Sequence, residues 1–139
     1  MIKLYTDGAC RGNQFRENKG AWAYLLLADS ECHLKGCSTP IRHEESGAVN
    51  NTTNNRMELT AVIEGLKRAF TTEVTVYSDS EYVVNTINQN WKRRKNLDLW
   101  LELDKLIDDK TTFKHVKGHS NNKYNNYVDS LCNKKLDEH

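Results

Sequence analysis

Four acidic residues occupy positions at which a carboxylate could do chemistry: Asp7, Glu58, Asp79 and Asp129. Asp7 and Asp79 each follow a short run of apolar and β-branched residues, so each is expected at the end of a buried strand. In an open α/β sheet, ligand sites form at the carboxyl ends of the strands. Two carboxylates close together repel each other, and a divalent cation is the usual way to relieve that repulsion. The residues alone therefore suggest a metal site, although Asp79 also fits a turn or helix-capping residue.

The elements that carry these acids are predicted from the spacing of apolar residues. Strands are expected at Ile2–Thr6, Ala21–Ala28, Cys32–Ser38, Val74–Tyr77 and Phe113–Val116. Helices are expected at Met57–Phe70, Ser80–Gln89, Leu97–Ile107 and Lys123–Leu136, the first capped by Thr52 or Thr53 and the second by Ser78 or Ser80. Pro40–Asn51, rich in charged residues and asparagine, is expected to be a loop. The order predicts an α/β fold, a mixed five-stranded sheet of three antiparallel leading strands plus parallel strands, flanked by helices.

The composition fits one domain spanning residues 1–139. Of the residues, 37% are hydrophobic and 28% are charged, and no apolar run is long enough to span a membrane. The opening residues MIKLYTDG contain no apolar signal core, so a cytoplasmic protein with reduced cysteines is expected. A net charge of +1 excludes a global polycation, and the basic residues of note are the run Lys92–Lys95.

Several sequence strings resemble the motifs of one family, type 1 ribonuclease H. They are TDGAC from Thr6, TTNNRMEL from Thr52, SDSEYV from Ser78, NLDLW from Asn96, VKGH from Val116 and NYVD from Asn126. They occur in the order of the family from Met1 to about Leu136. The resemblance therefore covers nearly the whole chain and implies the RNase H-like fold.

The resemblance implies an endoribonuclease that hydrolyses the RNA strand of RNA–DNA hybrids and leaves 5′-phosphate and 3′-hydroxyl ends. The four metal-binding carboxylates of the family fall on Asp7, Glu58, Asp79 and Asp129, with Asp7 as the shared ligand. Two Mg²⁺ ions would lie about 4 Å apart, one activating the attacking water and one stabilising the leaving oxygen. Mn²⁺ is an alternative ion. His119 matches the histidine of a mobile loop, suited to proton transfer or product release.

The resemblance also implies two sets of substrate contacts. Cys10, Asn13, Asn54 and Asn55 match residues that contact the minor groove. An asparagine amide can both donate to and accept from a ribose 2′-hydroxyl, which distinguishes RNA from DNA. Thr53, Asn90, Trp91 and Lys92 resemble positions that hold the backbone of the DNA strand.

The chain departs from many bacterial relatives between the second and third predicted helices. Those relatives carry a long basic protrusion there, whereas this chain has only the short segment Gln89–Asn96 with its compact basic cluster. Contacts to phosphates supply most of the non-specific affinity for nucleic acids. We therefore expect weak, salt-sensitive binding to the hybrid.

Three alternatives remain open. Integrases, transposases and junction resolvases share the carboxylate scaffold but lack the TTNNRMEL and VKGH strings. An RNase H-fold module that binds nucleic acid without cutting it would tolerate loss of an acid, yet all four acids and His119 are present. A nuclease active only with a partner protein or domain is the third, since the missing protrusion weakens the grip on substrate. A monomer is expected, with an RNA–DNA hybrid as its partner.

Overall fold

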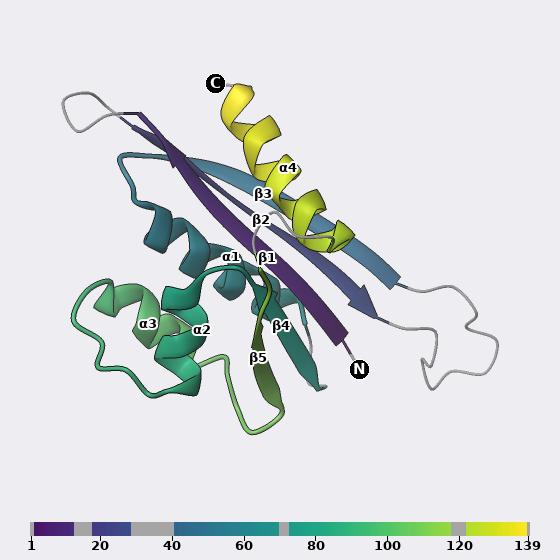
Figure 1. Ribbon diagram of the computed structural model, residues 1–139, viewed down its shortest axis with the longest axis vertical. Helices are drawn as coiled ribbons and strands as arrows, with labels where there is room; N and C mark the ends of the chain where they lie inside the picture. The colour runs from purple at the N-terminus through teal and green to yellow at the C-terminus, as the bar shows by residue number, and fades with distance from the viewer. Residues whose placement is uncertain (1, 13–17, 29–40, 70–72, 118–121, 139) are drawn as a thin grey trace.

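The computed structural model describes residues 2–12, 18–28, 41–69, 73–117 and 122–138, and a five-stranded sheet forms its centre (Figure 1). The strands are β1 (Ile2–Arg11), β2 (Lys19–Ala28), β3 (Ile41–Asn50), β4 (Val74–Ser78) and β5 (Thr111–His115), in the order β3-β2-β1-β4-β5. The pairs β1–β2 and β2–β3 are antiparallel, whereas β1–β4 and β4–β5 are parallel. The predicted mixed sheet is confirmed.

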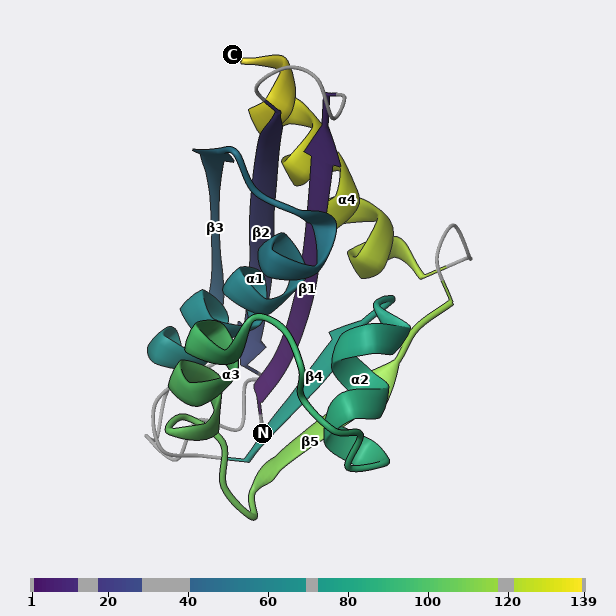
Figure 2. The same cartoon turned by 90° about the vertical axis from the view of Figure 1, so that its left-hand side faces the viewer.

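Helices cover both faces of this sheet (Figure 2). The helices α1 (Asn54–Arg68), α2 (Glu81–Asn88) and α3 (Leu97–Asp104) lie on one face, and α4 (Lys123–Asp137) lies on the other. Successive strand residues point to opposite faces and so supply two cores. Leu4 and Val76 pack with the first three helices, whereas Tyr5 and Leu25 pack with α4. Strand β1 is therefore buried on both sides.

Hydroxyl side chains cap the N-termini of α1, which carries Glu58, and of α2, which follows Asp79. Thr53 Oγ1 accepts a hydrogen bond from the backbone N–H of Arg56 at 3.1 Å and caps α1. Ser80 Oγ accepts one from the backbone N–H of Val83 at 3.2 Å and caps α2. Each residue is one of the two caps predicted for its helix. An N-cap side chain satisfies a backbone donor that would otherwise lack a partner, and this explains both helix starts.

The largest departure from the predicted elements is the edge strand β3. The prediction of a loop at Pro40–Asn51 is wrong, because β3 pairs with β2 along its whole length. None of its described side chains, at 42–50, is fully buried. The strand therefore lacks the alternation of apolar and polar residues by which a half-buried strand is recognised in a sequence. Charged residues on an edge strand are a common protection against unwanted pairing. The strand predicted at Cys32–Ser38 lies outside the described residues.

Several further boundaries differ from the prediction, among them those of β1 and α3. Strand β1 continues past Thr6 to Arg11, because its antiparallel pairing with β2 extends that far. Helix α3 ends at Asp104, and Ile107 lies beyond it, with its backbone N–H donating to the backbone oxygen of Leu103.

Among the helices of the described part of the chain, none is both long enough and apolar enough to cross a membrane.

Candidate active site

Strand register places two aspartates side by side. The parallel pairing of β1 with β4 ends where Thr6 lies opposite Ser78. The residue that follows Thr6 is Asp7, and the residue that follows Ser78 is Asp79. The expectation that Asp7 ends its strand is wrong, because β1 continues to Arg11. Asp7 instead marks the point where the parallel pairing ends. The two acids are therefore adjacent because of the register, not because both strands stop.

A third carboxylate reaches the same point from α1. The helix approaches β1 closely at Gly8, where an added Cβ would lie 2.4 Å from the backbone nitrogen of Glu58 and 2.5 Å from the carbonyl carbon of Met57. One carboxylate oxygen from each of Asp7, Glu58 and Asp79 lies within 4.8 Å of the other two. Asp7 is only 4% exposed and Glu58 only 8%. The structure thus brings together three of the four acids singled out in the sequence.

The donors in this cluster fit a divalent metal ion. Glu58 Oε2 is buried and has no hydrogen-bond partner. Burying a carboxylate oxygen without a partner costs free energy, and a bound cation would offset that cost. All the donors are carboxylate oxygens, which hard divalent cations such as Mg²⁺ prefer. The three acids can therefore hold a metal ion.

The fourth acid, Asp129, lies beside this cluster rather than within it. It sits half-buried in the second turn of α4, and its carboxyl group interacts with that of Asp7. Cys132, three residues further along α4, donates its buried thiol to the backbone oxygen of Asp7 at 3.4 Å. Burial raises the pKa of this thiol, which keeps it protonated as a donor. This contact, which sequence reasoning missed, holds α4 against β1 next to the acids.

Burial and mutual repulsion raise the pKa of two of the acids. Burial, followed by the negative charge of Asp79, raises the pKa of Asp7 from 3.8 to about 8. Burial, followed by the charges of Asp7 and Asp79, raises the pKa of Glu58 well above its ordinary value. A bound cation favours the ionised carboxylates, so metal binding is expected to release protons.

Without metal, the protein is expected to lose stability as the pH rises through the titration of Asp7. An acid with a raised pKa stabilises the fold fully below its unfolded-state pKa, and this contribution is lost as the pH rises through its folded-state pKa, here about 8. Between about pH 5 and pH 8, in EDTA, the free energy of unfolding should fall by roughly 4 kcal/mol more in wild type than in Asp7→Asn. Urea denaturation measures both values. Equal pH dependence of the two proteins would contradict the raised pKa of Asp7. The matched control is the variant Asp109→Asn, in which the replaced acid is exposed.

Two of the predicted site residues, His119 and Asn13, lie outside the described residues. His115 is an exposed residue at the end of β5. Its Nε2 lies 3.3 Å from the backbone oxygen of Asp79. The ends of β4 and β5 therefore meet beside the cluster.

The described residues expected to contact substrate form two groups, of which the first surrounds the start of α1. Thr53 is the cap, and Asn54 and Asn55 are exposed at the first two positions of the helix. Cys10 on β1 is half-buried and donates its thiol to the backbone oxygen of Thr52 at 3.5 Å. Three residues of this group thus lie at the start of the helix that carries Glu58, and Cys10 contacts the residue that precedes them.

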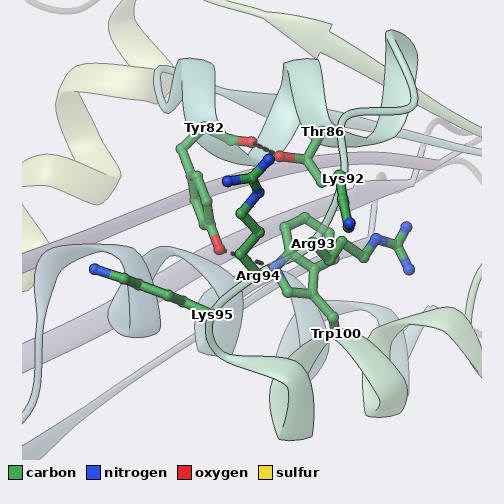
Figure 3. A pocket seen from close by; sticks show the side chains of 7 residues that line it. All are labelled: Tyr82, Thr86, Lys92, Arg93, Arg94, Lys95 and Trp100. Atoms are coloured by element: carbon green, nitrogen blue, oxygen red, sulfur yellow. Dashed lines mark hydrogen bonds between the residues drawn. The ribbon is translucent and has the colours of Figure 1, made fainter.

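The second group follows α2. Asn90, Trp91 and Lys92 are all exposed, and Asn90 has a left-handed backbone with φ of 53°. A cavity of about 180 Å³ lies beside them, lined by basic and aromatic side chains (Figure 3): Tyr82, Thr86, Lys92, Arg93, Arg94, Lys95 and Trp100. The compact basic cluster seen in the sequence therefore lies around a cavity next to Trp100.

Comparison with known proteins assigns the family. The sequence model of the RNase H family matches residues 1–137. The chain belongs to the RNase H family. Ribonuclease H of Caldanaerobacter subterraneus subsp. tengcongensis is 38% identical over an alignment that covers 100% of this chain and 93% of that protein.

Solved structures of other RNases H share the fold. LC9-RNase H1, a type 1 RNase H with the type 2 active-site motif, matches with a TM-score of 0.79 and 26% identity over 99% of this chain and 72% of that one. LC11-RNase H1, solved in complex with an RNA/DNA hybrid, matches with a TM-score of 0.76 and 22% identity over 99% of this chain and 98% of that one. The resemblance found in the motifs is confirmed, and so is the enzyme class, a ribonuclease H.

Proposed function

We propose that this RNase H hydrolyses the RNA strand of RNA–DNA hybrids at internal bonds, by two-metal-ion catalysis, and leaves 5′-phosphate and 3′-hydroxyl ends. The observation that carries the proposal is the cluster of Asp7, Glu58 and Asp79, whose oxygens lie within 4.8 Å of one another. The RNA/DNA hybrid bound to LC11-RNase H1 supports the substrate class. Residues 1–139 form one domain, and the enzyme acts as a cytoplasmic monomer.

Four carboxylates would hold the two ions, Mg²⁺ or in its place Mn²⁺: Asp7, Glu58, Asp79 and Asp129. When bound, such ions supply an activated water and stabilise charge on the leaving oxygen. The carboxyl group of Asp7 interacts with each of the other three, which supports its role as the shared ligand. Burial of Asp7 and Glu58 keeps water away from these ligands and holds their oxygens in place.

The remaining predicted residues bind substrate or move protons. His119 transfers a proton or assists the release of product. The minor-groove contacts that recognise ribose are Cys10, Asn13, Asn54 and Asn55, and the contacts to the DNA-strand backbone are Thr53, Asn90, Trp91 and Lys92. The exposure of Asn54 and Asn55 at the start of α1 supports their role, because their amides are free to face a 2′-hydroxyl.

A substrate panel tests the proposal. The isolated chain in Mg²⁺, and separately in Mn²⁺, is given an RNA–DNA hybrid, double-stranded DNA, double-stranded RNA and single-stranded RNA of matched sequence. Only the RNA strand of the hybrid should be cut, and EDTA should stop the reaction. If no substrate is cut in either metal but the hybrid still binds, the proposal fails, and a binding module or a partner-dependent nuclease takes its place.

Hybrid binding should depend strongly on salt through the run Lys92–Lys95. Each phosphate contact that is lost reduces the slope of log affinity against log salt by about 0.9. In a double variant, Lys92→Gln with Lys95→Gln, the slope should therefore become shallower by about 2. The matched control, Lys105→Gln with Lys110→Gln, removes two exposed lysines that lie between α3 and β5. Equal slopes in the two double variants would show that the basic run makes no phosphate contacts.

A further inference from the structure

The two groups of substrate residues lie on separate elements, and a duplex that contacts both needs a fixed spacing between them. One group is at the start of α1, at Thr53–Asn55, and the other includes Lys92–Lys95, here called the basic segment. Two groups that are already held at the spacing of the duplex bind it more tightly, because less ordering is needed when the substrate binds. A chain of side-chain contacts connects the two groups, and it begins at Arg56.

Arg56 connects the first turn of α1 to the first turn of α3. Its Nη1 donates to Asp98 Oδ1 at 3.0 Å and its Nη2 donates to Asp98 Oδ2 at 2.8 Å. A bidentate pair of this kind fixes both the distance and the angle between the two elements. The hydrogen bonds from Arg56 lower the pKa of Asp98 to about 2, so the pair stays ionised at neutral pH. Nη1 also donates to Asn96 Oδ1 at 3.3 Å.

Asn96 continues the chain of contacts toward the basic segment. Its backbone is left-handed, with φ of 58°, and its Nδ2 donates to the hydroxyl of Tyr82 at 3.3 Å. The indole Nε1 of Trp100 donates to the same hydroxyl at 2.9 Å, and Trp100 is only 1% exposed. Arg93 of the basic segment lies over the Trp100 ring, 4.6 Å from its centroid (Figure 3). Arg93 also pairs with Asp104. The basic segment is thus anchored to a buried tryptophan through Arg93.

Anchoring Arg93 leaves the other cations of the basic segment available to substrate. Lys92, Arg94 and Lys95 are exposed, and their side chains leave the segment in different directions (Figure 3). Their placement relative to Asn54 and Asn55 depends on the contacts that run from Arg56 to Trp100.

We propose that Arg56 and Asp98 are positioning residues that set the spacing between the start of α1 and the basic segment. This inference rests on the proposed function, since both groups must hold the same hybrid. The pair contacts no acid of the metal cluster in the described structure. It therefore acts on how well the hybrid binds rather than on the chemical step.

Two substitutions that change the charge in opposite directions test this role. Arg56→Gln removes a positive charge and Asp98→Asn removes a negative one, yet each breaks the bidentate pair. Each should raise KM for the hybrid roughly tenfold with kcat within about twofold of wild type, because binding and not chemistry is disturbed. The double variant should be no worse than either single variant, because one interaction is lost in all three. Arg68→Gln is the matched control, since Arg68 lies on the same helix and pairs with Glu45 at 3.2 Å.

A role through charge alone predicts a different pattern. Asp98→Asn would then lower KM, because it makes the surface more positive, while Arg56→Gln would raise it. That result, or unchanged KM in both variants, would overturn the positioning role. A purely structural role would appear as a lowered thermal midpoint with unchanged KM, and it too would overturn the inference. Failure of the proposed function is distinct, because wild type itself would then not cut the hybrid.

Discussion

Asp79→Asn is expected to lower the rate of hybrid cleavage by at least about 10³-fold, because metal ions supply several kcal/mol of stabilisation to the transition state. The asparagine amide keeps the size of the side chain but removes one of three carboxylates that lie within 4.8 Å of each other. Single-turnover cleavage in saturating Mg²⁺ gives the rate of the chemical step. Calorimetric titration with Mg²⁺ should show weakened metal binding in the same variant.

The fold of this variant should be unaffected. Removing one charge from a cluster of repelling carboxylates relieves repulsion, so the metal-free variant should unfold at the same or a higher urea concentration than wild type. Asp109→Asn is the matched control, since it makes the same chemical change at an exposed acid in the turn before β5. If the Asp79→Asn variant cuts the hybrid at the wild-type rate, Asp79 is not one of the metal-binding carboxylates.

Gly8→Ala is expected to have the second largest effect, on both cleavage and stability. An added Cβ would lie 2.4 Å from the backbone nitrogen of Glu58, so α1 would have to move away from β1. Overpacking against backbone costs about 1–3 kcal/mol of stability. The same movement would displace Glu58 from Asp7, and we expect cleavage to fall by roughly 10²-fold. Urea unfolding and single-turnover cleavage measure the two effects.

The matched control is Gly65→Ala, which lies in the same interface between α1 and β1. There an added Cβ meets the methyl groups of Leu4, the nearest at 2.6 Å, and a side chain can adjust where backbone cannot. Alanine also favours the helix over glycine by about 1 kcal/mol, which offsets part of the crowding. Gly65→Ala should keep cleavage close to wild type. Equal losses in the two variants would show that Gly8 has no particular role in placing Glu58.

The sequence predicted the elements that carry their own local signal. Thr53 and Ser80 were predicted as helix caps because hydroxyl side chains precede apolar residues at helical spacing. Strands β2 and β4 were predicted because buried strands are rich in apolar and β-branched residues. Strand β5 was located only in part, because Phe113 is its single buried residue. The acids were expected near each other at the ends of parallel strands, and they do lie together. For Asp7 the physical reason is different, because β1 continues to Arg11 and its register with β4 places Asp7 beside Asp79.

The strand β3 could not be predicted because its pairing comes from β2 and not from its own residues. Most of its side chains are charged or polar, and those at 42–50 are exposed or only partly covered, so the segment has the composition of a loop. For the same reason the length of β1 was underestimated. The residues Asp7 to Arg11 include Gly8 and two polar side chains, and only the neighbouring β2 shows that the strand continues.

The side-chain contacts around the site also could not be predicted, because their partners are far apart in the chain. Cys132 donates to the backbone of Asp7, and Arg56 pairs with Asp98, yet neither spacing has a periodicity that a sequence pattern reveals. The motif strings marked Arg56 and Asp98 as parts of two separate motifs. Only the fold shows that the two motifs touch.

The chemical identity of the cleaved ends tests the central claim most directly. Wild type is given a hybrid with labelled RNA in Mg²⁺, and the ends of the RNA fragments are analysed. Hydrolysis by water at a carboxylate-held metal site predicts 5′-phosphate and 3′-hydroxyl ends on the RNA and an intact DNA strand. Fragments with 2′,3′-cyclic phosphate or 5′-hydroxyl ends would mean that the ribose 2′-hydroxyl attacks instead, and would contradict the proposed role of the cluster.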